Sequence, residues 1–93
     1  MASTQAAKRA LEVISDQEWH LIAQRLNLPR RQVQVIQAIM AGHGKPEAIA
    51  HALGIQPSSV KTHIQRLYAN LGVHDRVEVV VRVFVELLEV RKA

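Results

Sequence analysis

Apolar side chains recur at helical spacing along most of the chain. A first helix is predicted over about 16–26, because Ser15 followed three residues later by Glu18 is the sequence signature of a capping box. After this start an apolar residue returns every three or four positions, as it does on the inner face of an amphipathic helix. The residues of that face are Trp19, Ile22, Ala23 and Leu26.

Proline and glycine divide the middle of the chain into three further predicted helices, over about 29–41, 46–53 and 57–71. Proline is tolerated at the start of a helix because the first backbone N–H groups have no partner within the helix. A glycine after the last turn can adopt the left-handed conformation that ends a helix. The prolines are Pro29, Pro46 and Pro57, and the closing glycines are Gly42, Gly54 and Gly72.

The last periodic segment, about 76–90, carries two competing patterns. Its many β-branched residues favour a strand, whereas polar residues at every third or fourth position predict a helix with one narrow polar stripe. Glu78 and Arg82 are spaced for an i,i+4 ion pair, and a lone strand would have no mate among the preceding helices. We therefore predict a helix, and an all-α bundle of four to five helices. The polar stripe consists of Glu78, Arg82, Glu86 and Glu89.

Apolar residues surround the polar stripe of this last helix. Packing on a small domain hides roughly a third to half of a helix surface, so the remaining apolar surface would be exposed on a monomer and predicts a partner. Alternatively, the helix at 16–26 covers this second face, and the sequence leaves both interpretations open. The predicted interface with this partner consists of Val77, Val81, Phe84, Val85 and Leu88.

The composition describes one small domain without disulfides. The chain has 93 residues and no cysteine, which excludes thiolate metal sites and fits a reducing compartment. No apolar run is long enough to span a membrane, and the start lacks the apolar segment of a signal peptide, so we expect a cytoplasmic protein. The net charge of +4 arises from residues 30–47 and 48–76, which contribute +2 each, and this basic middle suits a polyanionic partner.

None of the common catalytic or cofactor-binding patterns occurs in the sequence. The five histidines are scattered, without an H-E-x-x-H pattern or a close set of carboxylates, and no G-x-S-x-G, Walker or dinucleotide-binding glycine pattern is present. We therefore predict that the protein is not an enzyme. We expect no metal, cofactor or small-molecule ligand.

The spacing between 46 and 65 is typical of a helix-turn-helix. Ala50 is small where two helices would cross closely, Gly54 can end the first of them, and Val60 would point from the second back to the core. The intervening loop has the three-residue length of this motif. A plain helical hairpin would show the same pattern, so the spacing alone leaves both open.

A longer set of residues makes the pattern more specific. They are Leu28, Arg31, Gln32, Gln34, Val35, Ile36 and Gly42 upstream, then Ile55, Ser59, Val60, Lys61, Thr62, His63, Leu67, Leu71, Gly72, Val73 and Arg76. This set resembles the LuxR-type (GerE-like) DNA-binding domain over about 28–86. The resemblance implies sequence-specific binding of double-stranded DNA. It also implies a homodimer paired through the last helix and a LuxR-type domain over 28–93, which leaves an additional helix (11–27) outside it. The small, polar residues 1–10 predict a flexible N-terminus.

The resemblance further implies that a recognition helix over about Pro57–Leu71 enters the major groove. Lys61, Thr62 and Gln65 would then face base edges, which such side chains can contact. On a merely solvated face the same residues would have no such role. His63 would instead pack or hydrogen-bond locally, and Arg76 would act as a helix cap or pair with Asp75. The residues implied to meet phosphates or to brace the helix are Ser59, His63, Arg66 and Arg76.

Three features depart from the family pattern. Gln32 and Gln34 replace two usual glutamates, which weakens or remakes their polar contacts, and Asn70 stands where lysine is frequent, which removes one possible phosphate contact. One extra residue between Gly42 and Ile49 remodels the approach to the third helix. A stand-alone transcriptional regulator is our first hypothesis. The departures keep a second one open, a protein-interaction or adaptor module of the same fold that does not read DNA.

Overall fold

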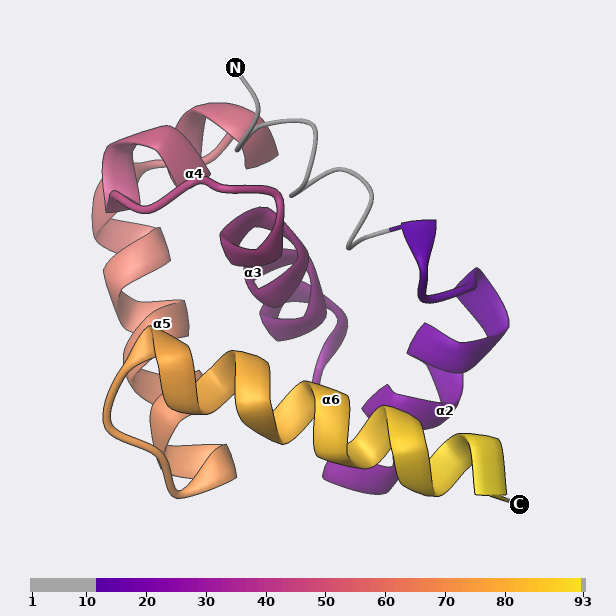
Figure 1. The fold of residues 1–93 in the computed structure, drawn as a ribbon. Helices are drawn as coiled ribbons and strands as arrows, with labels where there is room; N and C mark the ends of the chain where they lie inside the picture. Colours follow the sequence, from indigo (N-terminus) through magenta and orange to yellow (C-terminus); the bar gives the residue numbers. More distant parts are fainter. Residues whose placement is uncertain (1–11, 93) are drawn as a thin grey trace.

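The computed structural model describes residues 12–92, and its helices are joined by short turns (Figure 1). This range contains no strand, so the predicted all-α fold is confirmed, and the segment with two competing patterns is a helix. The flexible N-terminus expected at 1–10 lies outside the described residues. The helices are α2 (Asp16–Leu26), α3 (Arg30–Met40), α4 (Pro46–Leu53), α5 (Pro57–Leu71) and α6 (Arg76–Lys92).

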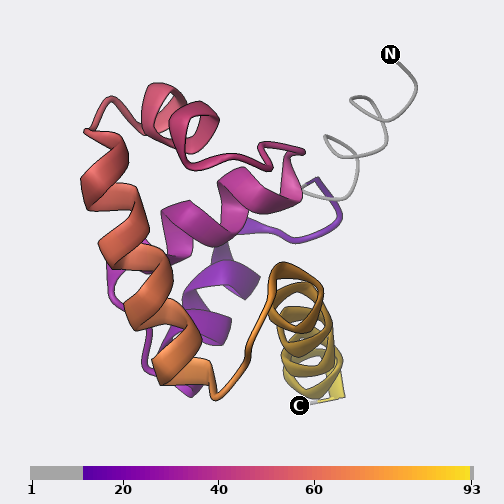
Figure 2. The same cartoon turned by 90° about the vertical axis from the view of Figure 1, so that its left-hand side faces the viewer.

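Helix α3 lies at the centre of the bundle and packs against each of the other four helices (Figures 1 and 2). Helices α4 and α5 pack together on one side of it, and α2 and α6 pack together on another. Burying one large aliphatic side chain stabilises a fold by about 1.5–3 kcal/mol, and every helix contributes at least one. The fully buried ones are Ile22, Val35, Ile36, Ile49, Val60, Leu67, Val79, Val83 and Leu87.

The helix ends follow the sequence signals, with one small shift at α3. Ser15 and Glu18 form the predicted capping box: Ser15 Oγ accepts from the Glu18 N–H at 3.1 Å, and Glu18 Oε1 accepts from the Ser15 N–H at 3.0 Å. Pro46 and Pro57 lie in the first turns of α4 and α5. Pro29, in contrast, lies one residue before α3 and occupies its capping position.

Helix α6 begins with a side-chain cap that its periodicity did not reveal. Asp75 Oδ1 accepts a hydrogen bond from the Glu78 N–H at 2.8 Å, and Glu78 Oε2 accepts one from the His74 N–H at 3.1 Å. Among the ion pairs of residues 12–92, none joins Glu78 to Arg82. The predicted Glu78–Arg82 pair is therefore wrong, because the Glu78 carboxylate turns toward the start of its own helix.

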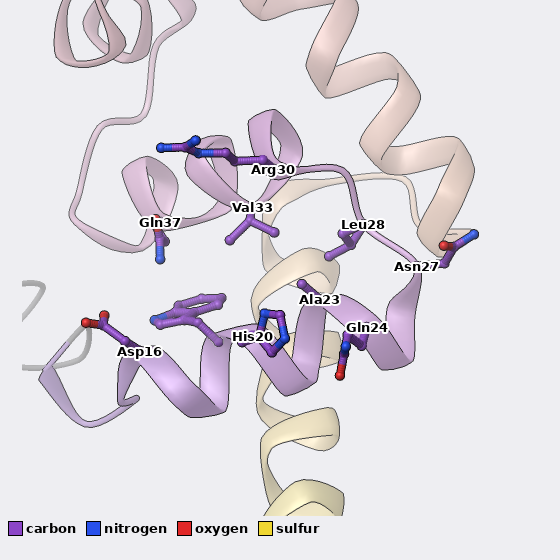
Figure 3. A pocket seen from close by; sticks show the side chains of 10 residues that line it. Asp16, His20, Ala23, Gln24, Asn27, Leu28, Arg30, Val33 and Gln37 are labelled. Carbon is purple, nitrogen blue, oxygen red and sulfur yellow. The ribbon is translucent and has the colours of Figure 1, made fainter.

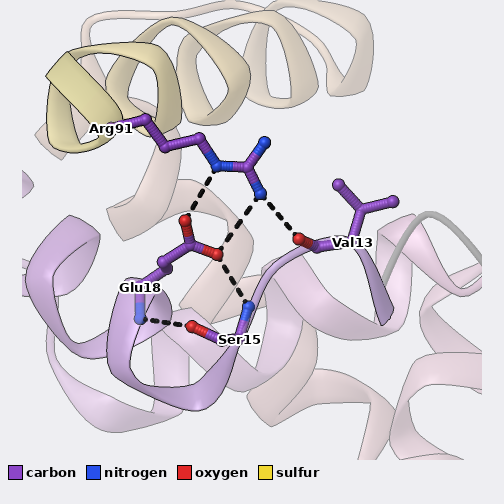
Figure 4. A network of polar contacts seen from close by, with 4 residues as sticks. All are labelled: Val13, Ser15, Glu18 and Arg91. Carbon is purple, nitrogen blue, oxygen red and sulfur yellow. Dashed lines mark hydrogen bonds and ion pairs between the residues drawn. The ribbon is translucent and has the colours of Figure 1, made fainter.

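Charged side chains fasten α2 to the C-terminal half of α6. Arg91 Nε donates to Glu18 Oε2 at 2.8 Å, and Arg91 Nη2 donates to the carbonyl of Val13 at 2.7 Å (Figure 4). Further along α2, Arg25 Nε donates to Glu86, whose residue surface is only 9% exposed. The polar stripe predicted for α6 is thus not wholly solvated, since Glu86 faces α2 and its charge is compensated there.

Candidate nucleic-acid interface

Helix α4, the turn that follows it and α5 form a helix-turn-helix. Gly54 ends α4 with a left-handed φ of 67°, and the Ile55 N–H then donates to the Ala50 carbonyl at 3.0 Å. Ala50 and Val60 are buried, with 3% and 0% of their surfaces exposed, and the two helices pack on each other. The small residue at the crossing, the glycine in the turn and the inward-pointing valine therefore take the places that their spacing predicts.

Helix α5 runs along one side of the molecule (Figures 1 and 2) and separates a buried face from an exposed one. Ser59 and His63 are half-buried at the boundary between the two. We call the outward surface, formed by the six implied DNA-binding residues of this helix, the α5 face. The inward residues are Val60, Leu67 and Leu71, and the exposed members of the α5 face are Lys61, Thr62, Gln65 and Arg66.

The α5 face is positively charged and contains no acid. Helix α5 has no aspartate or glutamate along its whole length, and Lys61 and Arg66 are both exposed. Its N-terminus has no side-chain cap, so the first backbone N–H groups and the positive end of the helix dipole are open to an anion. Phosphates along a nucleic-acid backbone could therefore approach the helix end and the two cationic side chains without repulsion from an acid on this helix.

Thr62 presents a methyl group more readily than a donor. Its hydroxyl donates to the Ser58 carbonyl one turn earlier, at 3.2 Å. This bond uses the only hydroxyl hydrogen, so the outward-facing group offers a methyl and acceptor lone pairs. That arrangement suits contact with an apolar feature of a base edge, such as the thymine methyl.

Arg76 binds the turn between α3 and α4 instead of pairing with Asp75. Its Nη1 donates to the carbonyl of Gly44, in the turn between α3 and α4, and no ion pair among residues 12–92 joins it to Asp75. The remodelled turn is thus tied to the start of α6. Burial raises the pKa of the neighbouring Tyr68 phenol, an effect that the Arg76 charge partly offsets.

Two of the three departures from the family pattern meet in space. Asn70 Nδ2, in the last turn of α5, donates to Gln32 Oε1 of α3 at 2.8 Å. Gln32 is only 4% exposed, so this bond satisfies a nearly buried amide. The two residues are 38 positions apart. The only sign of their contact in the sequence is that both depart from the family pattern.

Helix α6 exposes a continuous apolar surface, which we call the α6 stripe. Helix α2 packs where Val83 and Leu87 are buried and leaves this stripe uncovered, so the alternative in which α2 covers the second face does not hold for the described residues. The members of the α6 stripe and their exposed fractions are Val77 71%, Val81 56%, Phe84 36%, Val85 49% and Leu88 62%.

The main hollows of the described surface lie away from the α5 face. One of about 600 Å³ lies between α2 and α3, where Trp19, Leu28 and Val33 form its apolar part (Figure 3). A second, of about 440 Å³, borders the α6 stripe at Val77 and Val81. Within residues 12–92 no group of acidic and histidine side chains is arranged to hold a metal ion, and no helix is long and apolar enough to cross a bilayer.

The fold and the α5 face together define a helix-turn-helix domain, and comparison with known proteins identifies its family. The family model described as "GerE: Bacterial regulatory proteins, luxR family" matches residues 26–83. Because this match covers more than half of the chain, the protein belongs to the luxR family of bacterial regulatory proteins, as its motif residues predicted. Helix α2 and the last turns of α6 lie almost wholly outside the matched segment.

Two curated relatives are similar to part of this chain. Both are named "Probable transcriptional regulatory protein NarL", from Mycobacterium tuberculosis strains CDC 1551 / Oshkosh and ATCC 25618 / H37Rv. Each is 51% identical over 49 residues, which is 53% of this chain and 22% of the relative. The chain thus spans about a fifth of the length of these relatives. No solved structure matches the chain.

Proposed function

We propose that this protein binds double-stranded DNA sequence-specifically through the α5 face and acts as a transcriptional regulator in the cytoplasm. The observation that carries the proposal is an exposed, acid-free helix presented by the turn at Gly54. Membership of the luxR family and the names of the two relatives support it. The function is one of binding, without catalysis, cofactor or small-molecule ligand.

The exposed residues of α5 divide into two kinds of contact. Lys61 and Gln65 lie one turn apart on the exposed side, where a lysine can bond guanine acceptors and a glutamine can bond adenine in a bidentate manner. Thr62 would touch a thymine methyl between them. The residues that would meet phosphates or brace the helix are Arg66, the half-buried Ser59 and His63, and Arg76 at the start of α6.

A homodimer through the α6 stripe completes the proposal. The stripe is a row of exposed apolar side chains on a basic domain, and pairing it with the same surface of a second copy would remove it from water. Two copies related by a two-fold axis would address two half-sites about 10 base pairs apart, one helical turn of DNA. The surface supports this assembly because α2 leaves it uncovered.

Duplex binding over a series of salt concentrations tests the proposal. The wild type should bind random duplex with an affinity that falls steeply as salt rises, because phosphate contacts release counterions. Selection from random sequence should then yield a preferred site. In Lys61→Ala the loss of one base contact should cost about 1–3 kcal/mol on the preferred site.

Lys92→Ala provides the matched control, because it removes an exposed lysine at the far end of α6. This variant should bind the preferred site as the wild type does. Equal affinity of Lys61→Ala and wild type for that site would refute the role of Lys61. Failure of the wild type to prefer any duplex would refute the function itself.

The exposed α6 stripe favours a second candidate, a protein-interaction or adaptor module. In that case the tight contact of the protein lies on α6 and not on α5. Phe84→Glu would then abolish its biological activity, while Lys61→Ala would leave it unchanged. Under the DNA-binding function, Lys61→Ala must impair activity too, so the pair of variants separates the candidates.

A further inference from the structure

The hydrogen bond between Gln32 and Asn70 is the main polar contact between α3 and the end of α5 in the described part of the chain. Gln32 and Glu86 are the buried polar residues of that part, and Gln32 has an uncharged partner whereas Glu86 has a cation. An amide that is nearly removed from water destabilises a fold unless it is bonded. The contact is therefore specific, and its loss would lower the stability of the fold.

The position of this bond matters for α5. The N-terminal end of the helix is fixed by the turn at Gly54 and by the buried Val60. Asn70 lies in the last turn, ten residues beyond Val60, and its bond to Gln32 of the central helix adds a directional contact to the burial of Leu67 and Leu71 at that end. Lys61 and Gln65 lie between the two attachments, so the angle at which they are presented depends on both.

Gln32 and Asn70 are uncharged, whereas the family pattern that this chain resembles has charged residues at these two positions. The pattern places a glutamate where Gln32 stands and frequently a lysine where Asn70 stands. Since the two side chains touch here, an acid and a base at the same positions would face each other. This chain carries an amide at both positions, so the contact is kept while both charges are removed.

We propose that Gln32 and Asn70 are a positioning pair, an uncharged bond that sets the angle of α5 for base contacts. The proposal rests on the DNA-binding function proposed above. Base contacts demand a defined helix orientation, whereas long, flexible cationic side chains reach phosphates from several orientations.

Asn70→Leu tests the positioning role, because leucine has a similar size and cannot bond Gln32. The ratio of affinities for the preferred and a random duplex should fall about fivefold or more, as expected for lost base contacts. Affinity for random duplex, and its dependence on salt, should stay within about twofold of wild type. Simple unfolding would lower both affinities equally, so the ratio isolates the orientation of the helix.

Exchange of the amides for charges tests the pairing itself, by urea unfolding without DNA. Gln32→Glu alone buries a carboxylate against a neutral amide, so its unfolding midpoint should drop, and drop further as pH rises and the acid ionises. Gln32→Glu combined with Asn70→Lys should recover the midpoint and the duplex preference. The matched control is Gln34→Glu. It makes the same exchange two positions beyond Gln32, at a residue that is only half-buried.

The outcomes separate the two proposals. Additive effects of Gln32→Glu and Asn70→Lys on unfolding would overturn the pairing, whereas coupling of about threefold or more in the unfolding constant confirms it. Unchanged duplex discrimination in Asn70→Leu would overturn the positioning role alone. If the wild type prefers no duplex, the proposed function fails and the positioning role with it, while the unfolding cycle still decides on the pairing.

Discussion

At the scale of single residues, Glu18 has two structural roles. Its carboxylate closes the capping box of α2 and accepts hydrogen bonds from Arg91 at 2.8 and 3.3 Å (Figure 4). The bond to Arg91, and then the backbone bond to Ser15, lower its pKa from 4.5 to about 2. Both interactions require the ionised carboxylate, so protonation weakens the start of α2 and its attachment to α6 together.

This carboxylate predicts an acid-dependent stability. A lowered pKa in the folded state contributes stability that is present above pH 4.5 and is lost as pH falls toward 2. In Glu18→Gln this part of the pH dependence should disappear. Urea unfolding between pH 2 and pH 5 measures it, with Glu12→Gln as the control, since Glu12 is an exposed glutamate outside the network in Figure 4. Parallel profiles of wild type and Glu18→Gln would contradict the assignment.

At the scale of elements, local signals predict nearly all of the fold. Apolar periodicity, proline and glycine place every described helix, because these signals act within a few residues. The cap at Asp75 has a local signal as well, an acid followed three residues later by Glu78. The pairs Arg25–Glu86 and Gln32–Asn70 span 61 and 38 positions, and no periodicity specifies such contacts. The helix of the α5 face and its contacts through Gly54 and Val60 were thus predictable, whereas its bond through Asn70 to Gln32 was not.

The cap of α6 gives a prediction at this scale. Asp75→Ala removes the oxygen that accepts the Glu78 N–H and should destabilise the protein by about 1 kcal/mol. Asp75→Asn keeps an accepting oxygen and should retain most of the stability. Thermal unfolding of the two variants beside the wild type measures the difference. Equal loss in both would mean that the charge of Asp75, and not its cap, is what matters.

At the scale of the whole molecule, the two proposed surfaces belong to different helices. The α5 face lies on one side of the bundle, and α6 lies on another (Figure 2). Arg76 and Gly44 connect the start of α6 to the turn before α4. A dimer formed through α6 would therefore place two α5 helices at a distance set by the fold.

The α6 stripe predicts the oligomeric state. Val81→Glu introduces a charge at a position that is 56% exposed in one copy and should convert a dimer to a folded monomer. Affinity for a two-half-site duplex should fall, while a single half-site is bound as before. Sedimentation measures the change, and the control is Ala52→Glu, an exposed residue of α4. A wild type that sediments as a monomer at all concentrations would contradict the dimer.

The two ion pairs between α2 and α6 favour one relative direction of these helices, because α2 supplies the acid in one pair and the base in the other. Along α2 an acid precedes a base, and along α6 Glu86 precedes Arg91, so unlike charges meet only when the helices run in opposite directions. Docking α2 the other way round would set Glu18 beside Glu86 and Arg25 beside Arg91. The four charges therefore select one polarity of α2 against the reverse, in addition to the short connection to α3 and the burial of Trp19 and Ile22.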